Sequence, residues 1–173
     1  ITHTAGLLSL PCTARGGTVI VLTKPDPAQL VRAIQEHRVT EFFLPPTVIY
    51  RLLDIPDLQK KVDFSSLRYF LYGAAPMSVE KLKQAIEVFG PVMAGGYGQT
   101  EASPLITQTD ADDPLELRVE TVGRPLPGLE VQIKDPVTQQ NVGDDLTGEL
   151  CVRGHCVMLG YYNNPQATSD AID

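Results

Sequence analysis

The chain has 173 residues, of which 43% are hydrophobic and 20% charged, a composition typical of a globular protein and unlike that of disordered or fibrous chains. With 14 Lys and Arg against 21 Asp and Glu, the formal charge is -7, which argues against a nucleic acid or an anionic membrane as partner. No apolar run has the length of a transmembrane segment, and three cysteines without C-x-x-C spacing favour neither a disulfide framework nor a zinc site, so a cytoplasmic location is expected.

Strand and helix patterns alternate over the first hundred residues. The β-branched run at residues 18–23 predicts a strand buried on both faces, and further strands are expected at 41–45, 67–72 and 91–94. Between the strands, capping residues predict helices that begin after Asp26, Thr47 and Ser78, the last of them ending at Gly90. This order predicts a parallel sheet with helices packed on its faces.

The pattern changes after Thr107. Residues 129–134 and 148–154 alternate between polar and apolar, and together with 120–125 they predict antiparallel strands with one solvated face. We therefore expect an α/β subdomain over residues 1–112 and part of an antiparallel β-barrel subdomain over 113–173. Neither end of the chain falls in a polar linker, so we expect a piece of a longer protein.

Three of the predicted strands end in loops that are rich in glycine, proline or alanine. Ligands of parallel α/β sheets bind just beyond the carboxyl ends of the strands. Small residues at 73–75 would let a flat ligand lie on the backbone, Tyr97 offers an aromatic face, Thr100 a hydroxyl and Glu101 an oxygen ligand for Mg²⁺. The pattern predicts a nucleotide site. The alternatives are a tight turn at 73–76, a packed turn residue at Tyr97 and a surface carboxylate at Glu101.

Residues 97–101, Tyr-Gly-Gln-Thr-Glu, match the Tyr-Gly-x-Thr-Glu signature of the adenylate-forming superfamily, which includes acyl-CoA synthetases, luciferase and the adenylation domains of peptide synthetases. The segments 73–76, 122–128, 148–154 and 158–168 occur in the same order in that superfamily. The whole chain therefore resembles it, and is most similar to acyl-CoA synthetases of the fatty-acid type. The resemblance implies the second Rossmann-like subdomain of such an enzyme, followed by part of its barrel.

The same resemblance implies the role of each site residue. Tyr97 would stack on adenine, Thr100 would meet the α-phosphate, and Glu101 would bind Mg²⁺, with Thr100 and Glu101 as the catalytic pair. The nucleotide-binding set as a whole is Gly73, Ala74, Ala75, Pro76, Gly96, Tyr97, Gly98 and Thr100. The passage for the acyl group and CoA would be bordered by His3, Gly95 and Gly96.

The implied reaction activates a carboxylic acid with ATP as acyl-AMP and then transfers the acyl group to CoA. An apolar acid is expected, because the strand at Phe42, Phe43 and Leu44 has no acidic residue after Glu41 to pair with the ammonium group of an amino acid. The family's phosphate loop, ribose-binding Asp and catalytic Lys are missing, so the fragment alone is expected to be inactive, and self-association through the incomplete barrel is a further expectation. The alternatives are a non-catalytic nucleotide- or acyl-binding module and another adenylating enzyme.

Overall fold

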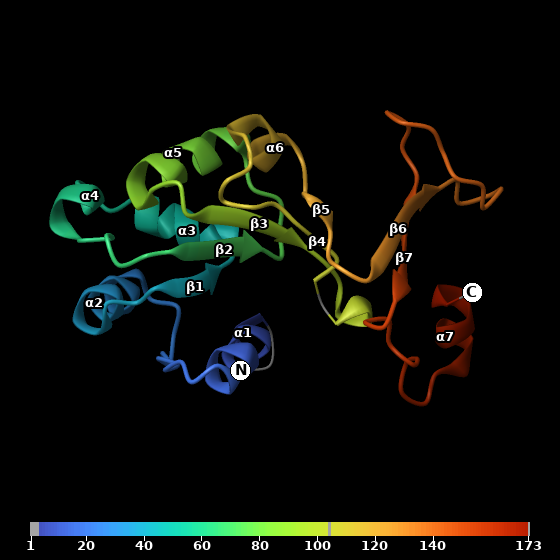
Figure 1. The fold of residues 1–173 in the computed structure, drawn as a ribbon, viewed down its shortest axis with the longest axis horizontal. Helices are drawn as coiled ribbons and strands as arrows, with labels where there is room; N and C mark the ends of the chain where they lie inside the picture. The colour runs from blue at the N-terminus through green and yellow to red at the C-terminus, as the bar shows by residue number, and fades with distance from the viewer. Residues whose placement is uncertain (1–3, 104, 173) are drawn as a thin grey trace. The chain divides into compact units, whose positions relative to one another are not determined.

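The structure is a computed structural model that describes residues 4–103 and 105–172, and it divides into two compact units (Figure 1). Unit 1 consists of Ile1–Gly96 and Thr109–Gly123, and unit 2 of Tyr97–Gln108 and Arg124–Asp173. This division differs from the boundary expected between residues 112 and 113. That boundary remains a prediction about the subdomains of the whole protein.

Unit 1 is built around parallel strands. β1 (Glu41–Leu44), β2 (Tyr69–Gly73) and β3 (Met93–Tyr97) pair in parallel, and Leu71 aligns with Phe43 on one side and Ala94 on the other. Figure 1 shows α3, α5 and α6 together on one side of these strands, with α1 near β1. The predicted α/β fold with flanking helices is thereby confirmed. Its helices are α1 (Thr4–Ala14), α2 (Pro27–His37), α3 (Pro46–Leu53), α4 (Leu58–Lys61), α5 (Val79–Phe89) and α6 (Leu115–Glu120).

The core of unit 1 lies between the sheet and helices α3 and α5. Phe70 at its centre is completely buried, and its ring centroid lies 4.2 Å from that of Phe42 and 5.2 Å from that of Phe89. Fully burying one such side chain contributes about 1.5–3 kcal/mol to folding. The aromatic cluster therefore fixes β2 against α5, and with it the place where β2 ends.

Local capping signals determine where the helices begin and end. The carboxylate of Asp26 accepts a hydrogen bond from the Gln29 N–H at 3.0 Å, and the Ser78 hydroxyl accepts one from the Lys81 N–H at 3.2 Å. Gly90 ends α5 with φ of 91°, in the region that favours glycine. These three predictions are confirmed. The expected cap at Thr47 is wrong, because α3 begins at Pro46, whose fixed φ suits the first helical position.

Three predicted elements differ in the structure. Residues 18–23 form no strand, and Val21 is 66% exposed, because no other described strand pairs with this run. The fourth strand begins later than expected, at Met93, and continues through Gly95 and Gly96, which were expected in a loop. Around residue 120 the chain forms α6 rather than a strand, and only Arg124–Pro125 is extended, as β5.

Unit 2 is built from antiparallel strands and short helices. β4 (Thr107–Gln108) pairs with β5, and β6 (Leu129–Lys134) pairs with β7 (Glu149–Gly154) along its full length, as the alternating pattern predicts. The 3₁₀-helix η1 (Thr100–Ala102) lies between β3 and β4, and α7 (Pro165–Ala171) follows β7. The strand order from β1 to β5 follows the sequence. Closure of a β-barrel remains a prediction.

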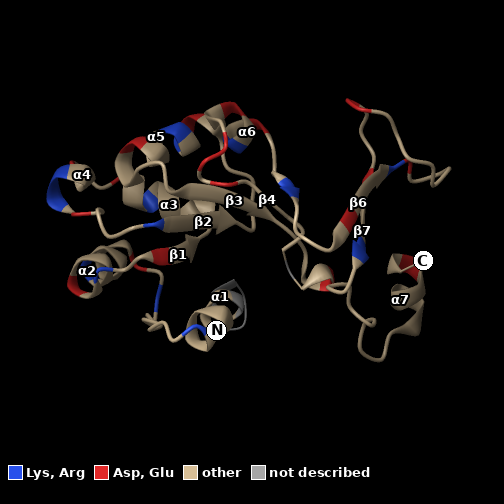
Figure 2. Ribbon diagram, viewed as in Figure 1, with Lys and Arg blue, Asp and Glu red and all other residues tan. Residues whose placement is uncertain are grey.

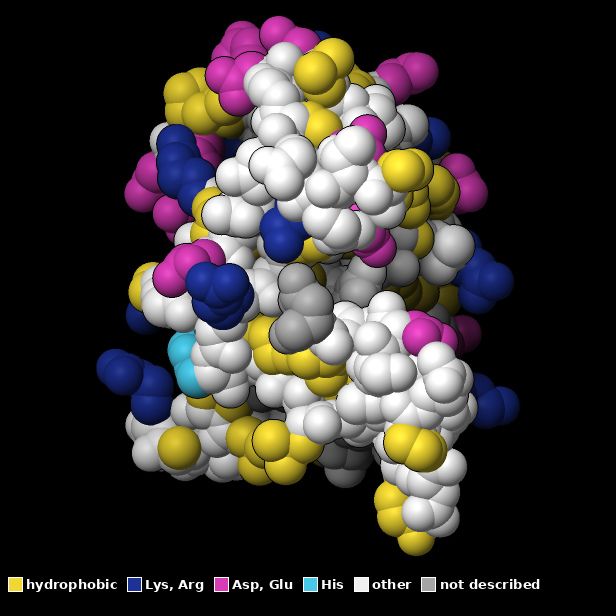
Figure 3. Space-filling view, turned by 90° about the vertical axis from the view of Figure 1, so that its right-hand side faces the viewer, with side chains coloured by type: hydrophobic (Ala, Val, Ile, Leu, Met, Phe, Trp, Pro, Cys, Tyr) yellow, Lys and Arg dark blue, Asp and Glu magenta, His cyan; other side chains and the backbone are white. Residues whose placement is uncertain are grey.

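The surface carries charges of both signs and separate apolar side chains. Figure 2 shows acidic and basic residues spread along both units. On the face drawn in Figure 3, hydrophobic side chains reach the surface at several separate places. Among the described residues, no helix has the length and apolar character needed to cross a membrane.

Candidate functional site

The segment at residues 73–76 follows β2 directly in unit 1. Gly73 is buried and pairs with Gly96 of β3, and a Cβ atom at Gly73 would collide with the Gly96 carbonyl oxygen. Ala74 has a φ of 67°, a left-handed conformation that alanine rarely adopts. Ala74, Ala75 and Pro76 are all exposed. The close backbone approach requires glycine at 73, and the strained residue after it turns the three exposed residues out of the sheet.

Two hydrogen bonds join Gly95 to Thr109 within unit 1. Its N–H donates to the Thr109 hydroxyl at 2.7 Å, and its carbonyl oxygen accepts from the Thr109 N–H at 2.9 Å. A Cβ atom at Gly95 would lie 2.8 Å from the hydroxyl oxygen of Tyr72 and 2.9 Å from its ring carbon Cζ. Tyr72 therefore fills the space that a side chain at position 95 would need. A backbone role of Gly95 at the substrate remains a prediction.

The signature segment, residues 97–101, lies in unit 2. Tyr97 is half-buried, and its carbonyl oxygen accepts a hydrogen bond from the N–H of Ile106 at 2.8 Å. Gly98 and Thr100 are exposed, and Ala102 is buried as the apolar anchor of η1. The segment is thus fixed at both ends while its polar residues face solvent.

Glu101 makes the most specific contact of this segment. One carboxylate oxygen, Oε1, accepts a hydrogen bond of 2.7 Å from the hydroxyl of Tyr161, 60 residues further along the chain. This hydrogen bond, together with one to the backbone N–H of Glu101 itself, lowers the pKa of the Glu101 carboxyl. The same contact raises the pKa of Tyr161. Glu101 is therefore a carboxylate, and Tyr161 a neutral donor, throughout the neutral pH range.

Residues 1–162 match the family model described as AMP-binding enzyme. The chain belongs to the AMP-binding enzyme family, within the adenylate-forming superfamily. It is 39% identical over 173 residues to the medium/long-chain-fatty-acid–CoA ligase FadD8 of Mycobacterium tuberculosis, an alignment that covers 98% of this chain and 29% of that protein. It is 40% identical to the putative acyl-CoA synthetase YngI of Bacillus subtilis, with 95% and 30% covered.

Solved structures of the AMP-binding enzyme superfamily have the same fold. The amide bond synthetase McbA from Marinactinospora thermotolerans superposes with a TM-score of 0.89 at 36% identity, over 97% of this chain and 34% of that one. ATP-bound MatB from Rhodopseudomonas palustris superposes with a TM-score of 0.87 at 29% identity, over 99% and 33%. The chain therefore spans about a third of the length of these proteins.

The Glu101 carboxylate is a donor group of the kind that binds a magnesium ion shared with a nucleotide. Among the described residues, no three acidic, His or Cys side chains are grouped so as to hold a metal ion. Magnesium does not require such a cage, because it is commonly bound through one or two carboxylates and the phosphates of the substrate. Glu101 is ionised, with Oε1 held by Tyr161, and so supplies one such carboxylate. A single glutamate is thus compatible with the ion that the family resemblance implies.

Sequence reasoning missed two residues that contact the predicted site residues. One of the residues that it did predict lies outside the described part of the chain. Thr109 is hydrogen-bonded to Gly95, 14 residues away, and Tyr161 to Glu101, 60 residues away, and the sole signal for Tyr161 was its place within the family segment at 158–168. His3 lies outside the described residues.

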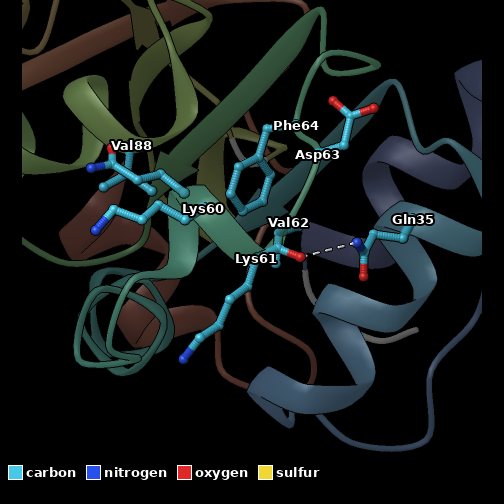
Figure 4. Close-up of a pocket in the computed structure, with 8 residues that line it drawn as sticks. Gln35, Lys60, Lys61, Val62, Asp63, Phe64 and Val88 are labelled. Carbon is cyan, nitrogen blue, oxygen red and sulfur yellow. Dashed lines mark hydrogen bonds between the residues drawn. The ribbon is translucent and has the colours of Figure 1, made fainter.

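A separate cavity of about 520 Å³ lies in unit 1 near α4, and its lining is drawn in Figure 4. The Gln35 side chain reaches across it to the Lys61 carbonyl oxygen at 3.4 Å, while Lys60 pairs with Asp57 at 2.7 Å. Its lining residues precede β2 and β3 in the chain, whereas the predicted nucleotide residues lie at the carboxyl ends of these strands or after them. The cavity is thus at the amino ends of the strands and apart from the family motifs.

Proposed function

We propose that this chain is part of an ATP-dependent acyl-CoA ligase that activates a carboxylic acid as acyl-AMP and transfers the acyl group to CoA. The observation that carries the proposal is the family match over residues 1–162, together with relatives that are acyl-CoA ligases along almost the whole chain. In the first step a carboxylate oxygen bonds to the α-phosphorus of ATP and pyrophosphate leaves. In the second, the CoA thiolate bonds to the acyl carbon and AMP leaves.

The family resemblance assigns each motif residue a role in the first step. In unit 1 the exposed residues Ala74, Ala75 and Pro76 offer a flat surface for adenine, which the positive φ of Ala74 turns out of the sheet. In unit 2 the half-buried Tyr97 offers a ring for stacking, which contributes about 1–3 kcal/mol per base. Thr100 offers a hydroxyl to the α-phosphate, and Glu101 a carboxylate to Mg²⁺. The ion neutralises negative charge on the phosphates.

We propose a fatty or other apolar acid as the substrate. The composition of β1 supports this choice, since its one acidic residue, Glu41, is exposed at its start and the rest of the strand is Phe42, Phe43 and Leu44. An amino acid would bring an ammonium group that none of the residues at the carboxyl end of β1 can pair. The relative FadD8 is named for medium- and long-chain fatty acids.

A second candidate differs only in the acceptor. The similarity to an amide bond synthetase, at a TM-score of 0.89 and 36% identity, supports as this second candidate an enzyme in which an amine takes the acyl group from acyl-AMP. Both candidates share the adenylating step, and the acceptor tells them apart.

The experiment is ATP–pyrophosphate exchange by the whole protein that carries this chain, with fatty, aryl and amino acids. We expect exchange with apolar acids, a large loss in Glu101→Gln, and little change in Glu116→Gln, which removes an exposed carboxylate of α6. The amide keeps the shape of the side chain and removes the charge that binds the ion. Product analysis with CoA or an amine then assigns the acceptor. Exchange with amino acids alone, or full activity in Glu101→Gln, would contradict the proposal.

A further inference from the structure

The segment that follows β7 holds both the side chain and the backbone of Glu101. The hydroxyl of Tyr161 donates to Oε1 of Glu101 at 2.7 Å, and the N–H of Met158 donates to its carbonyl oxygen at 2.8 Å. Both contacts lie within unit 2. A glutamate side chain that is free in solvent has several rotamers, and a hydrogen bond at one oxygen restricts them. The hydrogen bond from Tyr161 engages Oε1, so Oε2 is the carboxylate oxygen that Tyr161 leaves for a ligand.

Tyr161 is itself held by α7. Its N–H donates to the hydroxyl of Thr168 at 2.9 Å, and its carbonyl oxygen accepts from the N–H of Asn164 at 3.2 Å. A Cβ atom at Gly160 would lie 2.8 Å from Cγ2 of Thr168, and the φ of 149° at this position favours glycine. These contacts hold the backbone of Tyr161 independently of the hydrogen bond between its side chain and Glu101.

The neighbouring residue provides a comparison. Tyr162 is 93% exposed, although it has the same side chain and lies next to Tyr161 in the motif. Removing a hydroxyl from Tyr162 changes a group in solvent, whereas removing it from Tyr161 takes away a partner of Glu101. The pair of variants thus separates the contact from general effects of losing a tyrosine hydroxyl.

We propose that Tyr161 is a positioning residue, whose hydroxyl holds Oε1 of Glu101 so that Oε2 is presented to the magnesium ion of the bound nucleotide. This inference rests on the proposed function. The opposite role is physically distinct: a hydroxyl that competed with the ion for the carboxylate would weaken metal binding, and removing it would strengthen that binding.

The test compares Tyr161→Phe with Tyr162→Phe in the whole protein. We expect Tyr161→Phe to raise the KM for Mg²⁺ by about three- to tenfold, as for the loss of one solvent-screened hydrogen bond to a charged group. The KM for the carboxylic acid should not change. Tyr162→Phe should leave both constants as they are.

A second readout does not depend on turnover. Electron paramagnetic resonance measures the binding of Mn²⁺ in the presence of a non-hydrolysable ATP analogue, and Tyr161→Phe should weaken this binding by the same factor. Thr168→Val, which removes the hydroxyl that holds the backbone of Tyr161, should weaken it in the same direction. Circular dichroism establishes that each variant is folded.

The outcomes separate the two proposals. Unchanged or tighter Mn²⁺ binding in Tyr161→Phe overturns the positioning role, even where Glu101→Gln abolishes metal binding. Full Mn²⁺ binding and full exchange activity in Glu101→Gln overturn the metal assignment in the proposed function, and the positioning role with it. Weaker Mn²⁺ binding in both Tyr161→Phe and Glu101→Gln, with Tyr162→Phe unchanged, supports both.

Discussion

Gly95→Ala should destabilise the chain, because Tyr72 occupies the space that the new methyl group needs. The added Cβ atom would lie 2.8 Å from the Tyr72 hydroxyl oxygen and 2.9 Å from Cζ. Tyr72 has little freedom to move away, since it is only 8% exposed and its hydroxyl donates to the carbonyl oxygen of Arg118 at 3.2 Å. Both strands would have to shift for the methyl group to fit.

The net cost follows from two opposing effects. Overpacking of a well-packed core costs about 1–3 kcal/mol, whereas replacing glycine by alanine stabilises by about 0.4–1 kcal/mol through the unfolded chain. We therefore expect the free energy of unfolding to fall by about 1–2 kcal/mol. With a urea slope of about 2 kcal/mol per molar, the midpoint falls by about 0.5–1 M.

Urea unfolding of the 173-residue chain, followed by far-ultraviolet circular dichroism, measures this change. The matched control is Gly143→Ala, where the nearest atom to the new Cβ is Cδ1 of Leu146 at 4.0 Å, and little change or a small gain is expected. In the Tyr72→Phe background, Gly95→Ala should cost at least about 0.5 kcal/mol less, because the closest atom has been removed. An unchanged midpoint for Gly95→Ala, or the same cost in both backgrounds, would refute the steric reasoning.

Two further predictions concern the residues around the end of β2. Burial, opposed by the positive charge of Arg118, raises the pKa of Tyr72 from 10.0 to about 12, so its contribution to stability should be complete below pH 10 and lost as the pH rises toward about 12. Spectrophotometric titration should show one late-ionising tyrosine, which disappears in Tyr72→Phe; simultaneous ionisation of all tyrosines would contradict the burial argument. Ala74→Val should lower the free energy of unfolding by about 1–2 kcal/mol, because a β-branched residue is placed at a φ of 67°, while Ala75→Val, outside the left-handed region, should change it little. Equal effects of the two substitutions in urea unfolding would show that the conformation at Ala74 carries no strain.

The elements that sequence reasoning predicted well are those with local causes. Asp26 and Ser78 cap helices through contacts three residues away, and Gly90 ends a helix through its own φ. The alternation at 129–134 and 148–154 predicted two strands, and the structure pairs them over six residues. Such signals lie within a few residues of the feature that they determine, so one sequence suffices to see them.

The elements that it predicted wrongly depend on distant partners. The run at residues 18–23 has the composition of a buried strand, but a strand requires a neighbour for its hydrogen bonds, and composition does not say whether one is present. The helix α6, where a strand was predicted, also depends on a distant partner. Arg118 within it is buried against the sheet and donates to the carbonyl oxygen of Met93 at 3.4 Å. That contact spans 25 residues and has no local signature.

Two adjacent glycines of β3, Gly95 and Gly96, were assigned one common role but have different physical surroundings. Gly95 and Gly96 are adjacent, and side chains alternate along a strand, so the two positions face opposite sides of the sheet. The Tyr72 side chain occupies the space that a Cβ atom at position 95 would need, so packing alone requires glycine there. Gly96 faces away from Tyr72, and its carbonyl oxygen lies so close to Gly73 that the packing constraint falls on residue 73 instead. The assignment of both glycines to the acyl passage remains a prediction, and packing against Tyr72 is a separate physical reason for glycine at 95.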